Sequence, residues 1–145
     1  MKCLLDTNVL LRMSEPGTVA CDDALRMVAH LRRAGHELVI APQVMVEFWC
    51  AATRPSNRNG LGWSVEQADA ALTQWEASFG MVPETPAIYH EWRRLVGSIG
   101  VSGVQVHDAR IVAGMTVHGI THILTFNVAD FTRFAGIGVL DAASA

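Results

Sequence analysis

The chain has very little lysine and no excess of positive charge. Lys2 is the only lysine among 11 cationic residues, and 14 acidic residues leave a formal net charge of −3 at pH 7. This balance argues against a protein that binds nucleic acid through an overall positive charge. It does not exclude a nuclease, because an acidic catalytic site would itself contribute several of the negative charges.

Cysteine is scarce, and long apolar runs are missing. Cys3, Cys21 and Cys50 are odd in number, lack a CxxC spacing and lie in apolar surroundings. We therefore expect three small core residues of a reduced protein. The N-terminus has no signal-peptide pattern, and no apolar run is long enough to span a bilayer. These features predict a cytoplasmic protein without a membrane partner.

The motifs of several large enzyme classes are also missing. The sequence contains no GxGxxG, Walker loop, nucleophile elbow or HExxH. His118 and His122 are four residues apart, but Gly119 ends the expected helix between them, so they do not form a zinc pair.

Short apolar runs alternate with amphipathic stretches along the whole chain. The expected strands are 2–5, 38–40, 80–83, 123–125 and 139–140. The expected helices are 9–15, 19–34, 43–52, 64–79, 86–99 and 107–118, with a turn and a short helix over 127–134. This alternation predicts one α/β domain over 1–145, with a small parallel sheet flanked by helices on both faces.

Asp6 ends the first expected strand, at the edge of the sheet where ligands bind in open α/β folds. It could equally be a helix N-cap. Glu47 is the only charge in an apolar helix, and Asp108 shares its expected helix face with apolar residues. A buried, unpaired carboxylate costs several kcal/mol or takes up a proton. The alternatives are a distant arginine partner or partial exposure for Glu47, and a capping role for Asp108.

Asp130 could be an ordinary turn residue, but four carboxylates at one sheet edge would repel one another unless a cation held them. Asp6, Glu47, Asp108 and Asp130 offer only oxygen ligands, which suit Mg²⁺ or Mn²⁺. Such a site favours phosphodiester hydrolysis. The polar residues expected to orient the carboxylates or water are Thr7, Asn8, Thr125 and Asn127.

Four segments together resemble the PIN-domain proteins, and most closely the VapC toxins of toxin–antitoxin pairs. They are Leu4–Leu11, Val46–Phe48, His107–Ala109 and Leu124–Phe131. The resemblance implies a PIN fold and a Mg²⁺- or Mn²⁺-dependent endoribonuclease that inhibits translation by cutting structured RNA such as tRNA or rRNA. It also implies a homodimer and a VapB-type antitoxin whose C-terminal segment covers the active site.

Carried over by residue, the resemblance makes Asp6, Glu47 and Asp108 the core metal ligands and Thr125 an orienting group. Many members have Asp where this chain has Asn127, so Asp130 is expected to serve as the fourth acid, through water.

Arginines near the site are expected to hold flanking phosphates. The candidates are Arg54, Arg58 and Arg110, and loop 54–62 is a candidate substrate, dimer or antitoxin contact. Three alternatives stay open: a catalytically weak PIN-like module that binds RNA or a partner, cleavage of DNA, and a phosphotransfer or phosphatase-like domain. The last would need a lysine near the phosphoryl group, and Lys2 lies at the wrong end of its strand.

Overall fold

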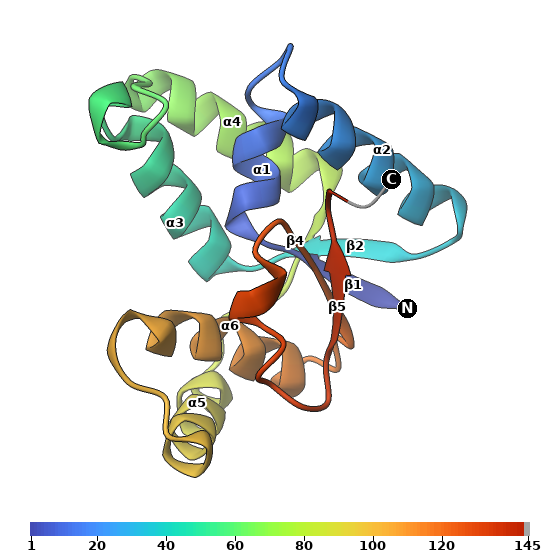
Figure 1. The fold of residues 1–145 in the computed structure, drawn as a ribbon, viewed down its shortest axis with the longest axis vertical. Helices are drawn as coiled ribbons and strands as arrows, with labels where there is room; N and C mark the ends of the chain where they lie inside the picture. The colour runs from blue at the N-terminus through green and yellow to red at the C-terminus, as the bar shows by residue number, and fades with distance from the viewer. Residues whose placement is uncertain (144–145) are drawn as a thin grey trace.

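A parallel sheet of five strands forms the centre of the molecule (Figure 1), in a computed structural model that describes residues 1–143. The spatial order of the strands is β3-β2-β1-β4-β5. Their bounds are β1 Lys2–Leu5, β2 Glu37–Ile40, β3 Gly80–Met81, β4 His122–Thr125 and β5 Gly138–Asp141. All four pairings are parallel, which confirms the α/β architecture expected from the alternating pattern.

Six α-helices flank the sheet, with α1 to α4 on one side and α5 and α6 on the other (Figure 1). They are α1 Thr7–Met13, α2 Val19–Arg33, α3 Pro42–Thr53, α4 Val65–Ser78, α5 Pro86–Ile99 and α6 Val106–Val117. Three short 3₁₀ turns are η1 Ser56–Arg58, η2 Gly103–Gln105 and η3 Val128–Asp130. Over the described part of the chain, no helix has the length and apolar character needed to cross a bilayer.

The register between β1 and β4 positions the polar residues that follow these strands. Leu5 is aligned with Leu124, and the amide of Asp6 donates to the carbonyl of Leu124 at 3.0 Å. Because both strands run in the same direction, Asp6 and Thr125 come to the same edge of the sheet. The first and the fourth strands are thus neighbours although about 120 residues separate them.

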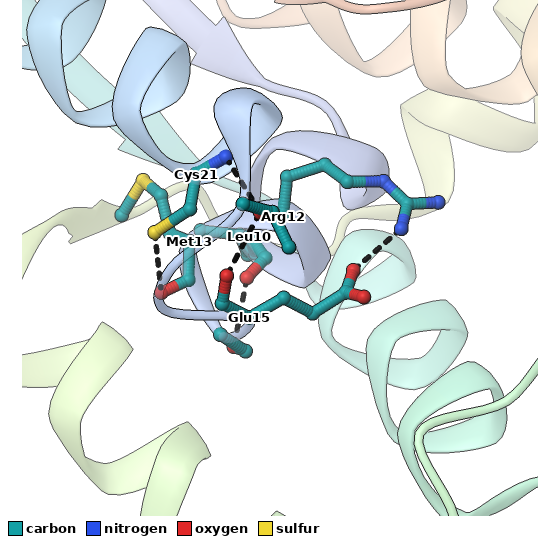
Figure 2. A network of polar contacts seen from close by, with 7 residues as sticks. Leu10, Arg12, Met13, Glu15 and Cys21 are labelled. Carbon is teal, nitrogen blue, oxygen red and sulfur yellow. Dashed lines mark hydrogen bonds and ion pairs between the residues drawn. The ribbon is translucent and has the colours of Figure 1, made fainter. Parts of the chain in front are cut away.

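The turn between α1 and α2 is closed by side-chain hydrogen bonds (Figure 2). The hydroxyl of Thr18 accepts from the amide of Cys21 at 3.1 Å and donates to the carbonyl of Glu15 at 2.9 Å. Arg12 pairs with Glu15 at 2.5 Å on the surface (Figure 2). These contacts end α1 after about two turns, close to the predicted helix end at residue 15.

Aromatic packing attaches α3 to α4 and to the loop between them. Phe48 is fully buried, and the rings of Trp63 and Trp75 meet it edge-on with centroids 6.1 and 5.9 Å away. Both tryptophans are partly buried and pack against the core.

The prediction that all three cysteines lie in the core is wrong for Cys50. Cys3 and Cys21 are buried, whereas Cys50 is exposed. The reason is that Cys50 lies one turn after Val46 and Glu47, on the face of α3 that points away from Phe48.

Gly60 is required by a close backbone approach in the loop after α3. A Cβ at Gly60 would lie 1.9 Å from the carbonyl oxygen of Arg54, whereas a Cβ at Gly97 in α5 would meet nothing within 4 Å. We expect Gly60→Ala to lower the free energy of unfolding by about 1–3 kcal/mol. Gly97→Ala should raise it by about 0.5–1 kcal/mol, because alanine favours a helix. Urea unfolding of both variants tests this, and equal stabilities would contradict the strict need for glycine at position 60.

Candidate active site

Carboxylates from four separate segments line one cavity at the carboxyl edge of the sheet. The cavity has a volume of about 350 Å³ and lies between the start of α1, one face of α3, the first turn of α6 and η3. Its lining residues are Asp6, Thr7, Asn8, Leu11, Glu47, Cys50, Ala51, Arg54, Asp108, Asn127 and Asp130. The structure therefore brings together all four acids that the sequence singled out.

Asp6 is the most constrained of the four. Its side chain is only 7% exposed, and its Oδ1 accepts from the amide of Thr7 at 2.8 Å. Its Oδ2 accepts from the hydroxyl of Thr125 at 2.8 Å and from the side-chain amide of Asn8 at 3.3 Å. Asp6 is therefore the N-cap of α1, which was one of the two roles expected for it, and it also lines the cavity.

Thr125 connects the two sides of this edge. It is fully buried, and its hydroxyl oxygen accepts from Asn8 Nδ2 at 3.2 Å and from the amide of Asn127 at 3.0 Å while donating to Asp6. Asn8 in turn accepts from the amide of Phe126 at 3.1 Å. Side chains of α1 are therefore tied to the end of β4 by a closed set of hydrogen bonds.

Glu47 and Asp108 are half-buried and carry raised pKa values. Burial, and then the charges of Asp6 and Asp108, raise the pKa of Glu47 to about 7, while Gln43 and Thr7 oppose the rise. Burial, and then the charges of Asp130 and Asp6, raise the pKa of Asp108 to about 6, opposed by His107. Burial also raises the pKa of Asp6. Among residues 1–143 neither Glu47 nor Asp108 has an ion-pair partner, so the distant-arginine alternative for Glu47 does not hold there.

Asp130 and Asn127 occupy the exposed side of the cavity. Asp130 lies close enough to raise the pKa values of both Asp6 and Asp108. The backbone amide of Asn127 donates to the hydroxyl of Thr125, and Asn127 also lines the cavity. Asn127 and Asp130, the two residues that the sequence offered for the fourth position of the site, therefore both line the cavity.

The donor chemistry of the cavity fits a hard divalent cation. All its acidic groups are carboxylates, and neighbouring acids raise the pKa values of Asp6, Glu47 and Asp108, a repulsion that a cation would relieve. The hydroxyl of Thr7 is buried and lies close enough to Glu47 to oppose the rise of its pKa, but it makes no hydrogen bond of standard geometry in the described chain. Within residues 1–143, however, no three His, Cys, Asp or Glu side chains converge closely enough to hold an ion directly. A cation bound here would therefore be held partly through water molecules, several of which Mg²⁺ usually retains.

The three candidate arginines occupy different environments. Arg54 lines the carboxylate cavity and Arg58 does not, whereas Arg110 lines an adjoining hollow that shares Glu47 and Cys50 with that cavity. Arg110 donates to Gln43 Oε1 at 2.9 Å and to Glu84 Oε1 at 2.5 Å. Gln43 also donates to the carbonyl of His107 at 2.8 Å, which joins α3 to α6.

Two residues of this region were missed by the sequence analysis. Gln43 lies one helical turn before Glu47 and opposes the rise of its pKa, and that spacing was a usable signal. Cys50 lines the cavity one turn after Glu47, but its apolar neighbours in the sequence concealed its exposure.

The hydroxyl of Thr125 should contribute to stability through its contact with Asp6. Thr125→Val keeps the shape but removes the donor to a buried carboxylate, so we expect a loss of about 1–3 kcal/mol in the free energy of unfolding. Thr116→Val is the matched control, because the hydroxyl of Thr116 donates only to Val112 within α6. Urea unfolding of the two variants should separate them, and equal losses would contradict the role of the Asp6 contact.

The raised pKa of Glu47 makes stability depend on pH. The folded chain binds more protons than the unfolded chain between pH 4.5 and about 7, so stability falls as pH rises through this window. In EDTA we expect Glu47→Gln to match the unchanged protein at pH 5 and to exceed its Tm by about 2–5 °C at pH 7.5. Glu76→Gln, at an exposed position of α4, is the control. A Tm difference for Glu47→Gln that does not change with pH would refute the shift.

The comparisons with known proteins agree with this fold. The profile of the PIN domain family matches residues 3–137. Among solved structures, VapBC2 from Rickettsia felis bound to a promoter DNA fragment matches with 15% identity and a TM-score of 0.72, covering 97% of this chain and 98% of that one. DNA-bound VapBC from Salmonella typhimurium matches with 16% identity and a TM-score of 0.71, covering 98% of each chain.

A third similar structure is VapBC-1 from nontypeable Haemophilus influenzae, with 16% identity, a TM-score of 0.69 and coverage of 99% of this chain and 100% of that one. No curated protein matches the chain by sequence. At these identities the structural likeness establishes the fold, and the family profile spans almost the whole length. The chain belongs to the PIN domain family.

Proposed function

We propose that the chain is a Mg²⁺- or Mn²⁺-dependent endoribonuclease that acts as the toxin of a VapBC-type toxin–antitoxin pair. The observation that carries this proposal is the meeting of four carboxylates from four segments in one cavity at the carboxyl edge of a parallel sheet. Carboxylates whose pKa values are raised by neighbouring acids, and which have no arginine or lysine partner among residues 1–143, are poorly explained by a structural role. They are well explained by a cation and a substrate phosphate.

In this proposal Asp6, Glu47 and Asp108 hold the cation, and Asp130 completes the site through water. The chemistry that a bound Mg²⁺ or Mn²⁺ supplies is Lewis acidity, which lowers the pKa of water and offsets charge on the scissile phosphate. Thr7, Asn8, Thr125 and Asn127 orient the carboxylates and the water around them.

The residues of the chain supply orientation and charge balance. The hydroxyl of Thr125 and the amide of Thr7 keep the Asp6 carboxylate in one direction. Gln43 and Thr7 favour the charged form of Glu47, against burial and two neighbouring acids. A carboxylate held in place before the substrate arrives needs little reorganisation during the reaction.

The partners are proposed from the same family context. The structural neighbours are described as VapBC complexes, two of them with DNA, so we propose a VapB-type antitoxin as the partner of this chain. We further propose a homodimer that cuts tRNA or rRNA in the cytoplasm and thereby inhibits translation. The modest overall charge implies that RNA is selected by shape and local contacts.

Cleavage of purified tRNA and rRNA, resolved on a denaturing gel, tests this function. We expect cleavage with Mg²⁺ or Mn²⁺, loss of cleavage in EDTA, and a decrease of more than about 100-fold for Asp108→Asn, because a metal-binding carboxylate is removed. Asp69→Asn, at an exposed position on α4, should retain full activity.

Cleavage that survives both EDTA and Asp108→Asn would refute the metal–carboxylate mechanism. RNA binding without any cleavage would instead favour the catalytically weak PIN-like module. That alternative has one observation in its favour, since the side chains of residues 1–143 do not converge into a compact cation site.

A further inference from the structure

Arg54 differs from the other arginines around the cavity because its positive charge is not used by the fold. It is exposed, it lines the carboxylate cavity, and it has no ion-pair partner within residues 1–143. Arg110 is committed to Glu84 and Gln43, and Arg58 lies in η1 outside the cavity lining. Arg54 is therefore the cavity-lining cation that is available to an anionic ligand.

The backbone around Arg54 is held by the loop that follows α3. The carbonyl of Arg54 accepts from the amide of Gly62 at 2.9 Å, and the carbonyls of Ala51 and Ala52 accept from Leu61 at 3.2 Å and Trp63 at 2.9 Å. The loop thus satisfies three carbonyls at the C-terminal end of α3, a region where helices leave such groups unpaired. These hydrogen bonds fix the backbone position from which the Arg54 side chain extends.

The position of Arg54 along α3 sets which part of a ligand it can reach. Seven residues separate it from Glu47, and this corresponds to about two turns or roughly 10 Å along the helix axis. Both side chains line the same cavity, Glu47 from within α3 and Arg54 from the C-cap position that follows it. In the proposed function the scissile phosphate lies at the cation held by Glu47 and Asp108, and the spacing favours contact of Arg54 with a neighbouring phosphate of the strand.

We infer that Arg54 binds a phosphate of the RNA strand that flanks the scissile one, and that it does so by bidentate contact of its guanidinium. The inference rests on the proposed function, since it assigns Arg54 a place in the same substrate site. Guanidinium groups match phosphate oxygens in geometry and cost less to desolvate than an ammonium group. A flanking contact positions the strand, so its loss raises KM more than it lowers kcat.

Cys50 provides a reporter of occupancy in the same cavity. It lies one helical turn before Arg54, lines the cavity and is exposed, whereas Cys3 and Cys21 are buried. An RNA strand bound by Arg54 is expected to cover the Cys50 thiol and so to slow its alkylation. The rate of Cys50 alkylation therefore measures binding without requiring cleavage.

The test compares Arg54→Gln with Arg33→Gln, a matched change at an exposed position in the last turn of α2, outside the cavity lining. Binding of a fluorescent single-stranded RNA is measured in Ca²⁺, which offsets the carboxylate charge, with a gel to show that the RNA stays intact. We expect Arg54→Gln to weaken binding roughly 10-fold and to reduce the salt slope by about 0.7, the value for one phosphate contact on a single strand. Arg33→Gln should change neither quantity, and Arg54→Lys should restore binding only in part.

RNA should slow the alkylation of Cys50 in the unchanged protein and in Arg33→Gln, but not in Arg54→Gln. The inference is overturned if Arg54→Gln binds RNA with the affinity and salt slope of the unchanged protein, or if RNA never protects Cys50. Failure of the proposed function is a separate result, in which RNA binding depends on Arg54 but no cleavage occurs with Mg²⁺ or Mn²⁺.

Discussion

The contact on which the site depends is the hydrogen bond from the Thr125 hydroxyl to the Asp6 carboxylate. It joins the ends of two neighbouring parallel strands, and both residues are buried. A carboxylate removed from water is stable there only because donors surround it, and Asp6 has three of them. These hydrogen bonds hold the start of α1 against the end of β4, where the cavity lies.

Electrostatic repulsion around that anchor gives the cavity its chemical character. Glu47 and Asp108 each have a raised pKa because they are half-buried beside other acids. The fold keeps these charges together although a folded protein without a function for them would gain stability by separating them. Such a local cost is typical of a site that is completed by a cation and a ligand.

The arginines of the region divide into structural and available groups. Arg110 links α3 and α6 to the segment before α5 through Gln43 and Glu84, so the walls that carry Glu47 and Asp108 are held at a fixed distance. Arg54 projects from the end of α3 with its charge unpaired in the described chain. Arg110 thus stabilises the cavity walls, whereas Arg54 is available to bind a ligand.

The sequence alone determined the alternation of strands and helices and the four acids of the cavity. Periodicity is local, and a charge on an apolar helix face is visible without coordinates. Only the tertiary structure decided which strands are neighbours, because pairing β1 with β4 depends on contacts between distant segments. It likewise decided that Thr125 anchors Asp6, that Cys50 is exposed, and that Arg54 rather than Arg110 lines the cavity. Burial and charge pairing depend on what packs against a side chain, and that information is not contained in its sequence neighbours.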